Sequence, residues 1–224
     1  MHELQKKART LKVAARYLGL RGDACAEPGM NALLNAVYAR MREVCQPKHR
    51  LLRVGLLASP ETGEVHIDGL KPVISKGLCR LLAECREGYV LLATLGMDVD
   101  MAMRLLMVTD AAAGAALGAC GSAYIDVYMD SVLRREAEAL RVNGMALTPR
   151  FSPGYGDAPL TMQRDILALC GAKTLGVQLT RGGLMLPEKS VTAIMGITRE
   201  GAQSCMHGCA TCEKKDCQFR EEEA

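Results

Sequence analysis

The order of hydrophobic patterns is the feature of this 224-residue sequence that most constrains its fold. Apolar residues three or four apart predict helices over 3–19, 30–45, 72–87, 98–108, 110–140 and 160–169. Apolar or alternating runs predict strands over 51–57, 65–67, 89–95, 175–180, 184–186 and 190–197. Helices and short strands in irregular order are typical of α+β folds, not of a regular βαβ array. We therefore expect a single α+β domain with a small, largely antiparallel sheet flanked by helices.

The composition changes near residue 198. The preceding part is rich in aliphatic residues, whereas the end of the chain has few of them and instead carries four cysteines and many charges. This change predicts one domain over 1–198, followed by a cysteine-rich C-terminal tail over 199–224.

Charge and hydropathy exclude several classes of protein. The net charge is +3, too small to indicate binding to nucleic acid or to a membrane surface. No apolar run reaches the length of a membrane span, and the N-terminus lacks the apolar core of a secretory signal. We therefore expect a cytoplasmic protein. In that compartment the six isolated cysteines are expected to be reduced structural thiols: Cys25, Cys45, Cys79, Cys85, Cys120 and Cys170.

The segment 150–159, Arg-Phe-Ser-Pro-Gly-Tyr-Gly-Asp-Ala-Pro, combines turn residues with side chains that suit a ligand. Pro153-Gly154 predicts a type II turn, with glycine at the position that needs a positive φ. Arg150 offers a planar fork that matches a carboxylate, and Tyr155 offers a ring face to a cation or a flat ring. A rigid surface turn is the simpler interpretation, but the full string is more specific than Pro-Gly alone. We interpret it as a ligand-binding loop.

The pattern Arg-x-x-Pro-Gly-Tyr-x-x-x-Pro resembles the S-adenosylmethionine-binding loop in the reactivation domain of vitamin B12 (cobalamin)-dependent methionine synthase. Five further strings resemble stand-alone bacterial versions of that domain, and the resemblance covers about residues 10–198. These strings are 16–19 (RYLG), 92–96 (LATLG), 121–126 (GSAYID), 152–157 (SPGYGD) and 187–191 (PEKSV).

The resemblance implies a function. In that family the domain caps a cobalamin that has oxidised to inert Co(II), an electron reduces the cobalt, and S-adenosylmethionine methylates the Co(I) formed. Arg150 would bind the methionine carboxylate, while Ser152, Gly154 and Tyr155 would line the adenosyl and sulfonium region. Asp126 would contact the cationic part of the ligand; otherwise it is an exposed helix carboxylate paired with a lysine or arginine.

Two departures from the family pattern are visible. The tandem tyrosines that follow the last matched strand of the synthase domain are absent, since no tyrosine occurs after Tyr155. The cobalamin-binding signature Asp-x-His-x-x-Gly is absent as well. A partner protein must therefore bring the corrinoid, and part of the family's pocket is missing or rebuilt.

Four cysteines in the tail have the spacing of a metal site: Cys205, Cys209, Cys212 and Cys217. Four thiolates can hold zinc or an iron–sulfur cluster. Zinc sites more often use two Cys-x2-Cys arms separated by a long loop, so the tight run favours an iron–sulfur cluster over zinc. Disulfides rank third, and His207 is expected to be a bystander. Cys-x3-Cys-x2-Cys also occurs in radical S-adenosylmethionine enzymes, but those place it early, after the first strand of a barrel.

These features lead to three hypotheses. The first is an activation subunit that supports reductive methylation of cob(II)alamin on a cobalamin-dependent methionine synthase, as part of that methyltransferase system in methionine biosynthesis. It would use S-adenosylmethionine and need a corrinoid partner and an electron donor. The second is an iron–sulfur electron-transfer or docking partner of another corrinoid methyltransferase protein, without methyl transfer. The third is a zinc-stabilised binding module.

Overall fold

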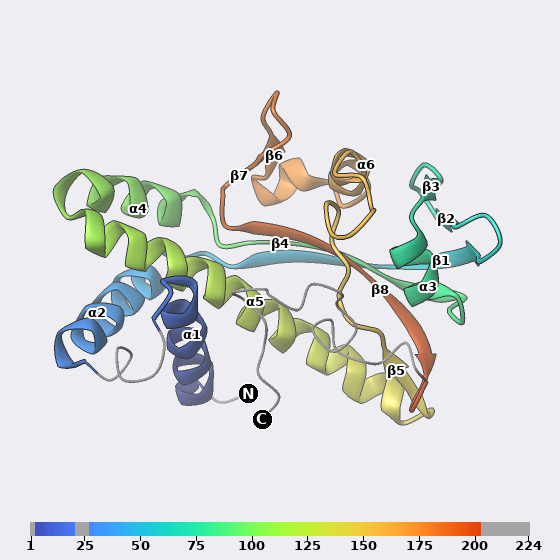
Figure 1. Ribbon diagram of the computed structural model, residues 1–224, viewed down its shortest axis with the longest axis horizontal. Helices are drawn as coiled ribbons and strands as arrows, with labels where there is room; N and C mark the ends of the chain where they lie inside the picture. Colours follow the sequence, from blue (N-terminus) through green and yellow to red (C-terminus); the bar gives the residue numbers. More distant parts are fainter. Residues whose placement is uncertain (1–2, 21–26, 203–224) are drawn as a thin grey trace.

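The computed structural model describes residues 3–20 and 27–202, and these form an α+β domain around one antiparallel sheet (Figure 1). The strand order is β3-β2-β1-β4-β8-β5, with every neighbouring pair antiparallel. The expected fold class is therefore confirmed. The strands are β1 (Lys48–Ser59), β2 (Glu64–Ile67), β3 (Val73–Ile74), β4 (Glu87–Thr94), β5 (Met145–Leu147) and β8 (Ser190–Arg199), with β6 (Gln178–Leu179) and β7 (Met185–Leu186) in a separate hairpin.

Helices cover both faces of the sheet (Figure 1). One face carries α1 (Glu3–Tyr17), α2 (Pro28–Val44) and the long α5 (Ala111–Arg141), with α4 (Met97–Thr109) packed against α5 and α2. The other face carries α3 (Lys76–Leu82), α6 (Met162–Leu169) and the 3-10 helix η2 (Ala172–Leu175). At 1.5 Å per residue, α5 is about 46 Å long and spans the whole sheet.

The central strands are buried on both sides. Along β4, Tyr89, Leu91 and Ala93 belong to the core under α5, while Val90 and Leu92 belong to the core under α6. Because successive strand residues face opposite sides of a sheet, burial on both sides produces a continuous apolar run. The buried strand expected over 89–95 is confirmed.

Two sequence-based predictions of secondary structure are wrong in part. The helix expected over 72–87 begins only at Lys76, because Val73–Ile74 pair with β2 and the Ser75 hydroxyl caps the helix by accepting from Leu78 N–H at 3.1 Å. The strand expected over 175–180 keeps only Gln178–Leu179. Leu175 is instead the last residue of the 3-10 helix η2, which ends at Gly176, where φ is +75°.

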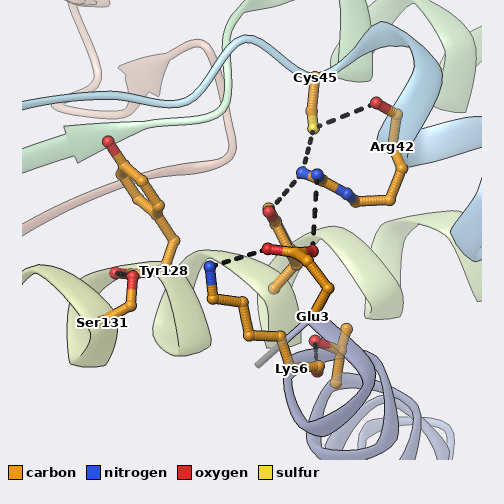
Figure 2. A network of polar contacts seen from close by, with 8 residues as sticks. Glu3, Lys6, Arg42, Cys45, Tyr128 and Ser131 are labelled. Atoms are coloured by element: carbon orange, nitrogen blue, oxygen red, sulfur yellow. Dashed lines mark hydrogen bonds and ion pairs between the residues drawn. The ribbon is translucent and has the colours of Figure 1, made fainter. Parts of the chain in front are cut away.

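Arg42 ties α2 to α5 and α1 (Figure 2). Its guanidinium donates to the Tyr124 hydroxyl and lies over the Tyr124 ring, with 4.9 Å between Cζ and the ring centroid. The same group lies 3.8 Å from the Glu3 carboxylate, which also pairs with Lys6. Cation–π contact and hydrogen bonding thus fix three helices against one another on this face.

The described cysteines form no disulfide, as expected for this group: Cys45, Cys79, Cys85, Cys120 and Cys170. Cys25 lies outside the described residues. Burial raises the pKa of Cys120 to about 12 and that of Cys170 to about 11. Because the thiolate is the reactive form, these two are structural rather than nucleophilic. Among the described residues, no helix is both long and apolar enough to cross a membrane.

Close packing between α3 and the sheet depends on a glycine in β8. A Cβ on Gly196 would lie 2.9 Å from Leu82 Cδ2 and 2.9 Å from Cys85 Cβ. We expect Gly196→Ala to lower the free energy of unfolding by about 1–3 kcal/mol, because overpacking forces buried side chains from their positions. Gly182→Ala is the matched control, since only Thr180 Oγ1 at 3.9 Å lies near its Cβ position. Chemical denaturation of both variants measures the difference, and equal stabilities would contradict the packing described.

Candidate ligand-binding site

The segment 150–159 is held along the edge of β8. Phe151 and Ile194 exchange two backbone hydrogen bonds of 2.9 and 2.8 Å, and Thr148 N–H donates to Gly196 C=O at 3.0 Å. From there the chain passes from β5 toward α6 (Figure 1). The loop therefore starts from a rigid sheet edge, which fixes the backbone of Arg150 beside β8.

The turn forms as its residue types predict. Tyr155 N–H donates to Ser152 C=O at 3.1 Å, and Gly154 has a φ of +87°. A positive φ at the glycine after proline is what a type II turn requires. Gly156 also has a positive φ, of +55°. The turn projects the Tyr155 side chain outward, with 68% of its surface exposed.

Asp157 anchors the far side of the loop to α3. Its carboxylate accepts hydrogen bonds from the Ser75 hydroxyl (2.6 Å), Lys76 N–H (2.6 Å) and Gly77 N–H (3.1 Å). The Ser75 hydrogen bond, together with those from the helix backbone, lowers the pKa of Asp157. This carboxylate is thus occupied in holding the loop, so it is an anchor rather than a free ligand-binding group.

Arg150 lies between two carboxylates of α5. Its Nη1 is 3.4 Å from Asp126 Oδ1 and its Nη2 is 3.4 Å from Asp130 Oδ1. The two aspartates are four residues apart, so they share one face of the helix. The structure thus brings the two predicted residues Arg150 and Asp126 together as an ion pair. Pairing with an arginine is also the alternative interpretation of Asp126, so its contact with a ligand stays a prediction.

Helix α1 extends this charged cluster. Arg9 Nη2 lies 2.7 Å from Asp130 Oδ2, and the Tyr17 hydroxyl donates to Asp126 Oδ2 at 3.2 Å. The result is a chain of alternating charge, Arg9–Asp130–Arg150–Asp126, that ends on Tyr17. We call these five residues the charge chain. Two guanidinium groups balance two carboxylates, which limits the cost of holding the charges partly out of water.

Burial shifts the pKa values of two residues of the charge chain, Tyr17 and Asp126. It is the main cause that raises the pKa of Tyr17 to about 12, and the neighbouring Asp126 carboxylate adds to the shift. Burial also raises the pKa of Asp126, while the positive charge of Arg150 opposes that rise. Tyr17 therefore stays a neutral hydrogen-bond donor at neutral pH, and it holds the carboxylate of Asp126 in place.

The guanidinium of Arg150 keeps unused hydrogen-bonding capacity. Its buried Nη1 atom approaches Asp126 at 3.4 Å, an ion-pair distance, yet it makes no hydrogen bond within residues 3–20 and 27–202. A buried donor without an acceptor is costly. The Arg150 side chain keeps 27% of its surface exposed, so a ligand carboxylate could approach the guanidinium there, while Asp126 would attract a positive group on the same ligand.

The remaining predicted residues lie on the turn next to this cluster. Ser152 is half-buried and Gly154 is exposed, with Tyr155 projecting beyond them. Sequence reasoning missed Asp130, Arg9 and Tyr17. The spacing of Asp130 from Asp126 is a detectable signal on a helix, whereas the approach of α1 depends on tertiary packing that no local pattern reveals.

The predicted metal ligands Cys205, Cys209, Cys212 and Cys217 lie outside the described residues. So does the proposed tail from residue 203 onward. Within the described ranges, no group of three or more histidine, cysteine, aspartate or glutamate side chains is arranged to hold a metal ion.

Comparison with known proteins relates this architecture to one kind of domain. No protein-family model matches the sequence, and no curated protein matches it. Among solved structures, the crystal structure of the MetH reactivation domain bound to AdoHcy is similar, with a TM-score of 0.61. The match covers 90% of this chain and 78% of that chain at 14% sequence identity. At this identity the likeness shows a common fold: this chain has the fold of the MetH reactivation domain.

Proposed function

We propose that this protein binds S-adenosylmethionine at the loop 150–159 and the charge chain. The observation that carries the proposal is the Arg150 guanidinium, which lies between Asp126 and Asp130 and whose Nη1 atom makes no hydrogen bond among the described residues. S-adenosylmethionine carries a carboxylate, an ammonium group and a sulfonium, so it matches this mixture of charges. The similar solved domain has AdoHcy bound, a ligand with the same amino acid end.

Each residue has a distinct role in this proposal. Arg150 receives the ligand carboxylate with its guanidinium, as a guanidinium fork does for carboxylates generally. Asp126 faces the positive groups of the ligand. Ser152, Gly154 and the exposed Tyr155 ring line the adenosyl and sulfonium side, where an aromatic face favours a cation. Arg9 and Asp130 position Arg150 without touching the ligand.

We further propose that the protein is an activation subunit for a cobalamin-dependent methionine synthase. The fold shared with the MetH reactivation domain and the matching Arg-x-x-Pro-Gly-Tyr string support this role. The sequence lacks the Asp-x-His-x-x-Gly signature, so a corrinoid protein would present its cobalamin to this chain. An electron donor would reduce the cobalt of that cobalamin, and S-adenosylmethionine would supply the methyl group to the reduced cobalt.

The domain over 1–198 would contain this site, and the tail over 199–224 would carry a metal centre. Four cysteines in one short run form a donor set suited to an iron–sulfur cluster, with zinc as the alternative. A cluster would supply the electron that reduces Co(II). The same donor set supports the second candidate function, an electron-transfer partner of another corrinoid methyltransferase protein that performs no methyl transfer.

Replacing Arg150 tests the binding site. We expect Arg150→Ala to weaken AdoHcy binding by about 1.5–3 kcal/mol, the range for hydrogen bonds to charged groups. This corresponds to a dissociation constant raised about 10- to 150-fold. Arg150→Lys keeps the charge but loses the fork, so its loss should be intermediate. Isothermal titration calorimetry of the folded variants measures the change.

Arg164→Ala is the matched control for that titration, because Arg164 is an exposed arginine on α6 outside the charge chain. It should bind AdoHcy like the wild type. Unchanged affinity in Arg150→Ala would remove Arg150 from the site, and absence of AdoHcy binding by the wild type would contradict the proposed function itself.

Metal analysis of anaerobically prepared protein tests the tail. We expect iron with acid-labile sulfide, and a visible absorption that bleaches on reduction, because four thiolates bind such clusters. Cys212→Ala should lose most of the iron. Cys45→Ala should keep it, because Cys45 is a free thiol of the main domain. Stoichiometric zinc without a visible chromophore would rule out the cluster.

A further inference from the structure

Among the described residues, one side of β1 lacks a neighbouring strand along eight of its twelve residues, 48–55. β1 pairs with β4 from Lys48 to Gly55, but it pairs with β2 only from Leu56 to Ser59. Among residues 3–20 and 27–202, no strand lies on the β2 side of 48–55. This sheet edge is open although β1 is one of the inner strands by order.

The hydrogen bonds around Gly55 show which backbone groups face the open side. Gly55 C=O accepts from Asp68 N–H at 3.1 Å on the β2 side, whereas Leu56 N–H donates to Arg86 C=O at 2.8 Å on the β4 side. Backbone groups alternate in direction along a strand. Arg53, Leu51 and His49 therefore direct their N–H and C=O groups toward the open side. We call the backbone of these three residues the free edge.

The free edge presents a row of strong hydrogen-bonding groups. Within the described part of the chain, no backbone or side-chain group bonds to the N–H or C=O groups of His49, Leu51 or Arg53 on that side. Such a row is a template for another strand. An added strand would satisfy these groups in the way that β-augmentation does.

A hollow of about 580 Å³ lies beside the free edge. Its apolar part comes from Leu52, Val54 and Leu169, and Arg53, Asp68 and Glu87 add charged groups to the lining. Leu52 and Val54 are on the α6 face of β1. Alternate side chains of an added strand would point to that face and could enter the hollow, because side chains alternate across a sheet. The hollow therefore favours apolar residues at every second position.

The charges along the free edge indicate which type of partner segment it would bind. Lys48, Arg50 and Arg53 are exposed along this stretch. Two carboxylates offset part of this charge: Glu87 pairs with Arg53 at 2.8 Å, and Asp68 accepts from Gly55 N–H at 3.1 Å. The excess of positive charge favours acidic side chains on the added strand. It also opposes pairing with a second copy of β1, which would place basic residues opposite one another. Basic residues are a common protection of exposed sheet edges against unwanted strand pairing. Such protection would not require an apolar hollow beside the edge.

We propose that the free edge of β1 binds an extended segment of a partner protein in which apolar and acidic residues alternate. The segment adds as a strand along His49–Arg53, with its apolar side chains toward the hollow and its acidic side chains near His49 and Arg53. This interaction surface is separate from the charge chain, so it does not depend on the binding of S-adenosylmethionine.

The test uses the full chain, labelled with ¹⁵N, and the probe peptide acetyl-Glu-Val-Glu-Val-Glu-Val-Glu-amide. We expect saturable chemical-shift changes centred on His49, Leu51 and Arg53, and amide exchange at Leu51 and Arg53 slowed about tenfold or more by the peptide. A peptide with lysine in place of each glutamate should bind at least about tenfold more weakly.

Charge-reversal variants complete the test. Arg53→Glu should weaken binding of the glutamate peptide severalfold, whereas Lys12→Glu at an exposed position on α1 should not. Arg53→Gln should weaken binding in the same direction, and it avoids placing a second carboxylate beside Glu87, which pairs with Arg53 in the structure.

Four results would overturn the proposal. These are absence of peptide binding at millimolar concentration, shift changes centred elsewhere, equal binding of the lysine peptide, and slow exchange at Leu51 and Arg53 in the free chain. The last would show that the edge is already paired. AdoHcy titration in the same samples reports on the charge chain separately, so failure of one proposal is distinguishable from failure of the other.

Discussion

Burial of β4 and β8 on both faces is the constraint on which the rest of the structure depends. Their alternate side chains enter two separate cores, one under α5 and one under α6. A sheet whose central strands are apolar on both sides needs a helical layer on each face. Functional side chains therefore cannot project from the middle of this sheet. They are confined to its edges and to the segments that connect the two layers, and the loop 150–159 is such a segment.

The charge chain shows how the fold gives a chemical role to a connecting segment. The backbone of the loop is fixed to β8 through Phe151 and to α3 through Asp157. Its arginine is then set between carboxylates of α5 that α1 holds from the other side. Three elements thus place one guanidinium whose Nη1 atom has no hydrogen-bond acceptor within residues 3–20 and 27–202. Under the proposed function, this positioning of the guanidinium before the ligand arrives would lower the cost of recognition.

Much of this arrangement could be predicted from residue patterns. The apolar run of β4 and the helical periodicity of α5 are strong local signals, and Pro153-Gly154 identifies the turn. Short elements were missed: β5 has three residues and β3 has two, so neither spans enough residues for a period to appear. The helix expected over 72–87 failed because the cap at Ser75 and the pairing of Val73 with β2 outweighed apolar spacing.

The candidate site was predictable only where its residues adjoin in sequence. Arg150, Ser152, Gly154 and Tyr155 belong to one short string, and Asp126 could be located only through the family resemblance. Arg9 and Tyr17 reach the site because α1 packs along α5, and that contact joins residues more than a hundred positions apart. Likewise, the free edge of β1 follows from where β2 leaves β1, a property of strand pairing rather than of composition.

Reconstitution of the reaction tests the central claim most directly. A cobalamin-binding methionine synthase that lacks a reactivation domain is prepared with inactive Co(II) and supplied with a reductant and S-adenosylmethionine labelled in its methyl group. The account predicts loss of the Co(II) signal and transfer of label to the cobalamin when this chain is present, and a large reduction of both with Arg150→Ala. Equal rates with and without this chain would contradict it.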